Sequence, residues 1–202
     1  MNKYLKKHIE ENYKSYFIFI IVFVLGMIIG IIALNNLNEE QKNSVSTYIT
    51  NFIETSKNSN IDYTALLKST ISKNFKFVLV TIIIDLSVFR LIASNLMIGY
   101  KGFCLGYSIS SIIAVIGIQR GLIFNLSLIF LSEIFYIPAI FYLNVSSLNL
   151  YKNLRDGNYD SKKFEIIRYC IKVGISSVMM ILSSLVETYI NTNLFLSFLK
   201  FF

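Results

Sequence analysis

The sequence predicts an all-α integral membrane protein, and three observations lead to this fold class. Of its 202 residues, 54% are hydrophobic and only 15% are charged, whereas soluble domains average about 25% charged residues. Several apolar runs approach or exceed the roughly 20 helical residues that a bilayer core requires. The net charge is +7, but the basic residues flank the apolar runs. This distribution is typical of membrane topology signals and argues against nucleic acid as a partner.

The predicted organisation is one membrane domain, residues 1–202, with about five transmembrane helices surrounded by lipid. The first apolar run is longer than the core of a secretory signal, so we expect an uncleaved helix. The long apolar region from 77 to 118 is divided in two because Asn95, Gly99, Lys101 and Gly102 interrupt it. The spans are expected at residues 16–34, 77–97, 103–118, 122–143 and 166–190, with a leader at 1–15, loops at 35–76 and 144–165, and a tail at 191–202.

Lys and Arg in the short segments beside the spans favour a cytoplasmic amino terminus in the cell membrane and an external carboxy terminus. Residues 35–76 then form an extracytoplasmic segment between the first two spans. Its apolar residues recur at helical spacing, which predicts short amphipathic helices. We expect Tyr48, Phe52 and Ile53 to be the apolar anchors of a partner-docking surface.

Four charged residues, Asp85, Arg90, Glu133 and Glu187, fall inside the predicted spans. Each would cost on the order of 3 kcal/mol at the bilayer centre without a partner. Their predicted depths allow Arg90 to neutralise Glu133, with Asp85 as a competing partner. Three interpretations stay open, namely a static structural pair, a proton or ion path, and a polar lock between helices that a partner can open.

Glycines four residues apart allow two helix backbones to approach closely. This spacing occurs at Gly26 and Gly30 and again at Gly102 and Gly106. The pattern is compatible with packing within one chain and with packing between copies in a homo-oligomer.

No catalytic constellation is present in the sequence. The chain has one histidine, no phosphate-binding glycine loop and no nucleophile elbow. An intramembrane aspartyl pair would need a second Asp besides Asp85. We therefore predict no catalytic residue, metal site or cofactor, and we do not expect the protein to be an enzyme.

Four motifs follow one another along nearly the whole chain. Asn12 to Tyr16 closes the basic leader, Gly102 to Gly106 follows a lysine, Leu131 to Ala139 carries a glutamate before a Pro-Ala step, and Leu185 to Ile190 holds a Glu-x-Tyr. In this order they resemble the stage II sporulation protein M family. One departure is that Asn125, Leu126 and Ser127 stand where family members often carry a histidine.

The resemblance implies a multi-pass membrane protein of endospore-forming bacteria that acts in engulfment of the forespore. It further implies a scaffold that anchors or recruits the peptidoglycan-degrading stage II sporulation proteins P and D. The charged residues inside the spans keep an alternative open, a transporter or channel-like membrane component.

Overall fold

The structure is a computed structural model that describes residues 2–58, 61–85, 89–156 and 159–200. Within these ranges the chain is helical, and no strand is found. Two π-helical segments, η1 and η2, interrupt the longer helices by joining α6 to α7 and α8 to α9. The elements are α1 Asn2–Glu11, α2 Tyr13–Asn35, α3 Glu39–Asn58, α4 Tyr63–Asp85, α5 Arg90–Ile116, α6 Ile118–Asn125, η1 Leu126–Phe130, α7 Leu131–Asp156, α8 Tyr159–Leu185, η2 Val186–Asn191 and α9 Thr192–Leu199.

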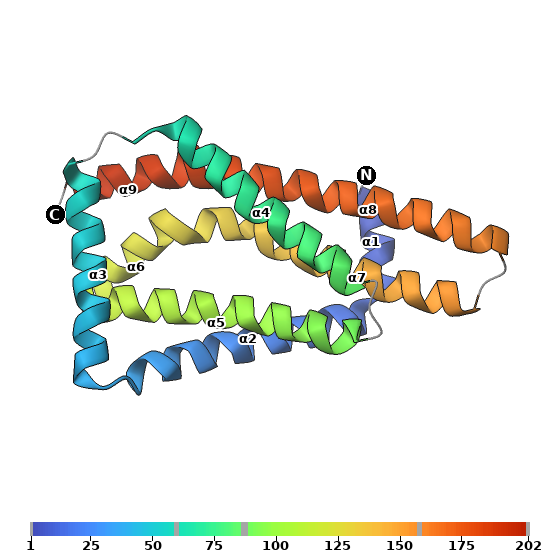
Figure 1. The fold of residues 1–202 in the computed structure, drawn as a ribbon, viewed down its shortest axis with the longest axis horizontal. Coiled ribbons are helices and arrows are strands. Elements are labelled where there is room, and N and C mark those ends of the chain that lie inside the picture. The colour runs from blue at the N-terminus through green and yellow to red at the C-terminus, as the bar shows by residue number, and fades with distance from the viewer. Residues whose placement is uncertain (1, 59–60, 86–88, 157–158, 201–202) are drawn as a thin grey trace.

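The helices form an elongated bundle (Figure 1). Along its length run α2, α4, α5, the continuous rod from α6 to α7, and the rod from α8 to α9. Helix α3 lies across one end, which we call the α3 end. Helix α1 lies toward the other, the α1 end, where the hairpin of α7 and α8 projects beyond the other helices.

The structure confirms an all-α, multi-pass membrane protein. Among the described residues, four helices are long and apolar enough to cross a bilayer, namely Tyr13–Asn35, Arg90–Ile116, Ile118–Tyr151 and Lys162–Leu199. Large apolar side chains cover their outer faces, as a lipid environment requires. Examples are Ile29 at 57% exposed, Leu96 at 68% and Val178 at 57%.

Helices α2 and α5 make the most extensive contact in the bundle, and glycines carry it. Gly26 lies against the backbone of Gly99 and Phe103, and Gly30 lies against Phe103 and Tyr107. From the other side, Gly102 and Gly106 meet the backbone of Phe23 and Met27. Partner numbers rise together along both helices, so the two helices are parallel. The glycine motifs therefore pack against each other within one chain.

The predicted break between residues 97 and 103 is wrong, because α5 runs without interruption from Arg90 to Ile116. The residues taken as interruptions have roles inside the helix. Gly99 and Gly102 give α2 its close approach, and the Asn95 side-chain amide donates to the Leu91 carbonyl at 2.7 Å. Helix α4 ends at Asp85 instead. The predicted spans at 77–97 and 103–118 are thus replaced by α4 and α5.

Helix α4 returns the chain from the α3 end to the α1 end (Figure 1). Because α2 and α5 are parallel, the chain between them has to run back along the bundle once, and α4 is the helix that does so. It is not among these four apolar spans, since it carries Lys68, Lys73 and Lys76. Asp62 begins α4 as its N-cap: its carboxylate accepts from the backbone N–H of Thr64 at 2.9 Å. The Thr64 hydroxyl also donates to this carboxylate, at 2.6 Å, and this bond, together with the backbone N–H groups of Ala65 and Thr64, lowers the pKa of Asp62.

The two ends of the bundle are closed differently. At the α3 end, Ile49 and Ile53 of α3 pack against Phe124, Phe195 and Leu199. Toward the α1 end, the His8 ring of α1 lies 4.9 Å from that of Tyr142. Burial there, together with the charge of Lys172, lowers the pKa of His8 to about 4, so the ring is neutral at pH 7.

The glycine contact predicts opposite effects for the same substitution at two positions. A Cβ on Gly106 would lie 2.8 Å from Met27 Cα, whereas nothing lies within 4 Å of a Cβ on Gly174 in α8. Gly106→Ala should therefore destabilise the protein by about 1 to 3 kcal/mol, as overpacking does. Gly174→Ala should be neutral or stabilising by up to about 1 kcal/mol. Thermal unfolding of both variants in detergent measures the difference, and equal stability would contradict the close α2–α5 packing.

Candidate functional site

A polar cavity of about 220 Å³ lies inside the bundle. It is formed where α4, α5, the η1–α7 rod and the α8–η2 rod meet. Its polar lining consists of Lys73, Asn74, Lys101, Cys104, Ser108, Ser132, Glu133, Tyr136, Ser183 and Glu187. So many polar groups in a bundle built for lipid need a physical reason, because each is costly to place there without partners.

The four charged residues of the cavity come from four different elements. Lys73 belongs to α4, Lys101 to α5, Glu133 to α7 and Glu187 to η2. Two ammonium groups thus face two carboxylates, and their formal charges cancel. The cavity is consequently polar without carrying a net charge.

Lys101 and Glu133 form a direct ion pair. Lys101 Nζ lies 2.6 Å from Glu133 Oε1 and 4.4 Å from the centroid of the Tyr136 ring. The side chains are only 22% and 14% exposed, so water screens this pair less than a surface pair. The second carboxylate oxygen, Oε2, is buried and has no hydrogen-bond partner among the described residues. It is available to a polar molecule in the cavity.

The two π-helical segments lie beside each other along this cavity. Asn191 of η2 donates its side-chain amide to the carbonyl of Leu128 in η1 at 2.9 Å, and to Ser132 Oγ at 3.1 Å. Ser183 Oγ donates to the Ser132 carbonyl at 2.9 Å. Single π turns inside α-helices occur frequently at functional sites. Here Glu133 follows η1 and Glu187 lies within η2, and both line the same cavity.

On the α4 side, a buried hydrogen bond ties the cavity wall together. The Asn74 amide donates to Ser184 Oγ at 2.8 Å. Asn74 and Ser184 are 6% and 0% exposed. This bond fixes helix α4 to helix α8.

The structure differs from the expected pairing of Arg90 with Glu133. Arg90 begins α5, and its guanidinium lies 3.3 Å from the centre of the Tyr151 ring. Lys101 lies eleven positions farther along the helix, a rise of about 16 Å. Because α5 is continuous, Lys101 and not Arg90 reaches Glu133. The side chain of Asp85 lies outside the described residues.

Two charged residues of the cavity were missed by sequence reasoning. Lys101 was assigned to a break and Lys73 to the extracytoplasmic segment. The glycine spacing on both sides of Lys101 was the signal that could have shown Lys101 to lie within a packed helix. Gly99, Gly102 and Gly106 form one helical face that matches Gly26 and Gly30, and a helix through that face carries Lys101 into the bundle.

The predicted docking residues on α3 have different surroundings. Tyr48 is 74% exposed and Phe52 is 44% exposed, although the Phe52 ring also stacks on Phe195 at 5.7 Å. Ile53 is only 9% exposed and packs in the core of the α3 end, so its expected role as a partner anchor is wrong. A groove of about 520 Å³ runs beside Tyr48 and Phe52, between α3 and the Tyr107, Ile112 and Leu128 side chains.

A family model described as stage II sporulation protein M matches residues 19–192. This range contains the α2–α5 glycine contact, both π-helical segments and all four charged residues of the cavity. No curated protein and no solved structure matches the chain.

The ion pair predicts a specific energetic coupling. Lys101→Gln and Glu133→Gln should each destabilise the protein, because each leaves a partly buried charge without its partner. The double variant should recover part of the loss, with a coupling free energy of about 0.5 to 3 kcal/mol. Unfolding in detergent gives the four stabilities. Arg90→Gln combined with Glu133→Gln is the matched control and should be additive; coupling to Arg90 in place of Lys101 would refute the assignment.

Proposed function

Because the chain belongs to the stage II sporulation protein M family, we propose that this sporulation membrane protein is a non-enzymatic scaffold. In this role it recruits peptidoglycan-degrading proteins, the stage II sporulation proteins P and D, to the membrane during engulfment. The observation that carries the proposal is α3, which lies across the end of the bundle and leaves an aromatic surface open.

The surface on α3 suits a docking role because its two faces differ. The inner face holds Ile49 and Ile53, which anchor the helix to the bundle. The outer side presents Tyr48 next to a groove of about 520 Å³ with a largely apolar lining. Exposed aromatic residues beside a pocket are frequent anchors of protein interfaces. A partner can therefore bind here without displacing α3.

The proposal includes an orientation, with the α3 end outside the cell and the α1 end in the cytoplasm. Two considerations support it. The α7–α8 hairpin and the leader at the α1 end carry Lys162, Lys163 and Lys14, as expected for a cytoplasmic side. A partner that degrades peptidoglycan works outside the membrane, where this orientation places α3. Helix α4 then crosses the bilayer as the second of five spans.

A second candidate function is a conduit for a small polar species, and the polar cavity favours it. The cavity holds two Lys and two Glu in the bundle interior. The double variant Lys101→Gln and Glu133→Gln separates the two functions. A scaffold retains partner recruitment and sporulation in this variant, whereas a conduit loses sporulation while the partners are still recruited.

The docking surface predicts the effect of two changes on α3. Tyr48→Ser removes the exposed anchor, and Ser44→Trp fills the groove that Ser44 lines. Both variants should stay in the membrane but fail to concentrate a fluorescent fusion of protein P or D at the engulfing membrane. Thr47→Trp, at an exposed position that does not line the groove, is the matched control. Normal partner localisation in both groove variants would exclude this surface.

The orientation predicts which residues a membrane-impermeant maleimide reaches in intact cells stripped of their wall. Single cysteines are introduced at Lys57, Lys163 or Lys200 after Cys104 and Cys170 are changed to Ser. We expect labelling at 57 and 200 and none at 163. Between positions 57 and 163 the chain contains α4, α5 and the rod from α6 to α7. If all three cross the membrane, the two positions lie on opposite sides. Labelling of both positions would therefore mean that α4 does not cross.

A further inference from the structure

Two buried oxygen atoms at the polar cavity need hydrogen-bond donors that the described residues do not supply. Glu133 Oε2 and Asn191 Oδ1 have no partner among those residues. Asn191 is 1% exposed, and its amide nitrogen already donates to Leu128 and Ser132. Burying an acceptor without a donor is costly. The cavity, of about 220 Å³, has room for several water molecules that supply the donors.

The polar cavity adjoins the groove beside α3. Ser108 of α5 and Leu128 and Ile129 of η1 line both spaces, so the two meet at these side chains. Ser108 places a hydroxyl at this junction, and Ser111, about one turn farther along α5, lines the groove. The groove is larger, about 520 Å³, and its lining includes the 74% exposed Tyr48. Water that leaves the cavity at the junction therefore enters a space that reaches the surface.

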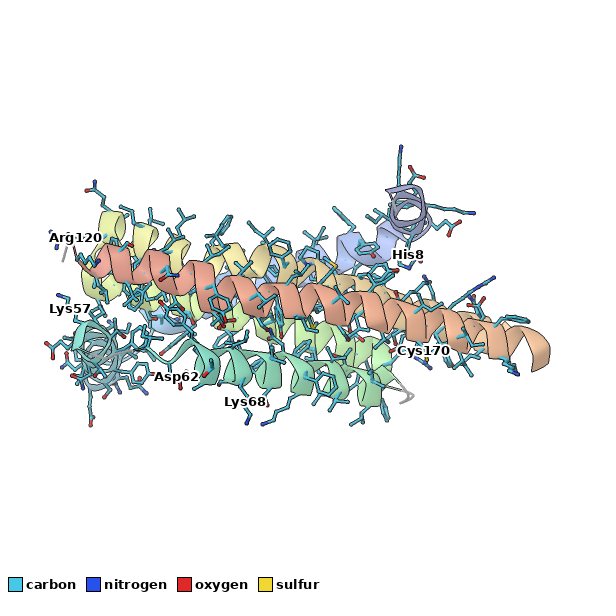
Figure 2. All side chains as sticks on the ribbon, turned by 90° about the horizontal axis from the view of Figure 1, so that it is seen from above. His8, Lys57, Asp62, Lys68, Arg120 and Cys170 are labelled. Carbon is cyan, nitrogen blue, oxygen red and sulfur yellow. The ribbon has the colours of Figure 1, made fainter. Side chains whose placement is uncertain are left out.

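The groove lies at an end of the bundle that faces water. Figure 2 shows Lys57, Asp62 and Arg120 at the α3 end. All three side chains are exposed, and exposed charges are costly in hydrocarbon. Cys170 lies far from them, toward the other end of the bundle. The α3 end therefore lies at a membrane surface, and the groove joins the cavity to the aqueous side there.

Toward the α1 end the cavity is closed. Tyr136 forms its floor, since it lines the cavity, is only 6% exposed and packs its ring 5.8 Å from that of Phe77. Beyond it in α7 come Ala139, Ile140 and Leu143, which are almost fully buried in the same apolar core. A close-packed apolar core of this kind leaves no room for a column of water. The cavity thus has an entrance on the α3 side and ends at Tyr136.

We propose that the polar cavity and its junction with the groove form a one-sided aqueous vestibule. It takes up water and small hydrophilic cations from the α3 side, brings them to Glu133 and ends at Tyr136. Cations suit the site because both oxygen atoms without partners are acceptors, and the ammonium of Lys101 is already paired. This inference goes beyond the recruitment of partners, because it depends on the route past Ser108 and not on what binds in the groove.

The native Cys104 gives a direct test, because it lines the cavity. The chain has two cysteines, so Cys170→Ser leaves Cys104 as the single thiol. The full-length variant is placed in lipid nanodiscs and treated with 2-(trimethylammonium)ethyl methanethiosulfonate, a small permanent cation. This reagent forms a disulfide with a thiolate and releases methanesulfinate, and apolar surroundings suppress the thiolate. Mass spectrometry of the intact protein gives the rate.

A matched cysteine that faces lipid sets the background rate. Leu182→Cys, in a chain without the native cysteines, lies next to the cavity-lining Ser183 but on the outer face, where Leu182 is 44% exposed. We expect Cys104 to react on the order of a hundredfold faster than Leu182→Cys. Ala139→Cys, about one turn beyond the floor, should react no faster than Leu182→Cys.

Two changes at the junction test the route. Ser108→Phe narrows it and should slow the reaction at Cys104 about tenfold, whereas Leu128→Ala widens it and should speed the reaction severalfold. The matched control is Ala114→Phe, at an exposed position of α5 that lines neither space, and it should leave the rate unchanged. Thermal unfolding in detergent checks that each variant is folded. Leu128→Ala decides the route if Ser108→Phe does not fold.

Three results would overturn the proposal. If Cys104 reacts as slowly as Leu182→Cys, no aqueous path reaches the cavity. Unchanged rates in the folded junction variants would place the entrance elsewhere. A reaction at Ala139→Cys as fast as that at Cys104 would show that the path does not end at Tyr136. A nanodisc exposes both faces of the protein to the reagent, so none of these results depends on the proposed orientation or on partner recruitment.

Discussion

The close approach of α2 and α5 through their glycines is the constraint on which the rest of the bundle depends. In a bilayer the hydrophobic effect does not drive one helix onto another, so association rests on backbone contact and buried polar groups. Gly26 and Gly30 provide that contact against Gly99, Phe103 and Tyr107. Because the two helices are parallel, α4 has to run the opposite way, and α5 has to be continuous. Lys101, one residue before Gly102, is consequently held on the bundle interior.

The polar cavity follows from this arrangement. Once α5 carries Lys101 inward, the η1–α7 rod supplies Glu133 at 2.6 Å and the α8–η2 rod supplies Glu187. Asn191 joins the two π-helical segments through Leu128 and Ser132, so both glutamates are held by the same hydrogen-bonded seam. Glu133 and Glu187 belong to the motifs that resembled the family most specifically. Because both glutamates line one cavity, the two motifs contribute to the same site although they are far apart in the sequence.

Sequence reasoning predicted the class of the fold and two of the charged residues in the cavity, but not their partners. Long apolar runs and their basic flanks are local properties, which is why they indicate a multi-pass helical protein. The break near Gly99 and Gly102 was placed wrongly because glycine and lysine interrupt hydropathy without interrupting a helix. The role of Gly99 and Gly102 depends on their packing against the helix of Gly26 and Gly30, about 70 residues earlier in the sequence. Ile53 failed as an anchor for a similar reason, since periodicity identifies an apolar face but not which part of it the bundle already covers.

The parallel pairing of α2 and α5 also has a consequence for how the chain is made. Synthesis proceeds from the amino terminus, so α4 leaves the ribosome before α5 and α8, the helices that pack beside it. Helix α4 carries three lysines, Lys68, Lys73 and Lys76, and is not among the candidate spans found in the described residues. Its stable place in the membrane therefore awaits residues that are translated later, including Ser184, the partner of Asn74. A chain that ends before α8 therefore lacks the Ser184 partner of Asn74, and among the described residues α4 has no side-chain hydrogen bond to hold it in the bundle until α8 is made.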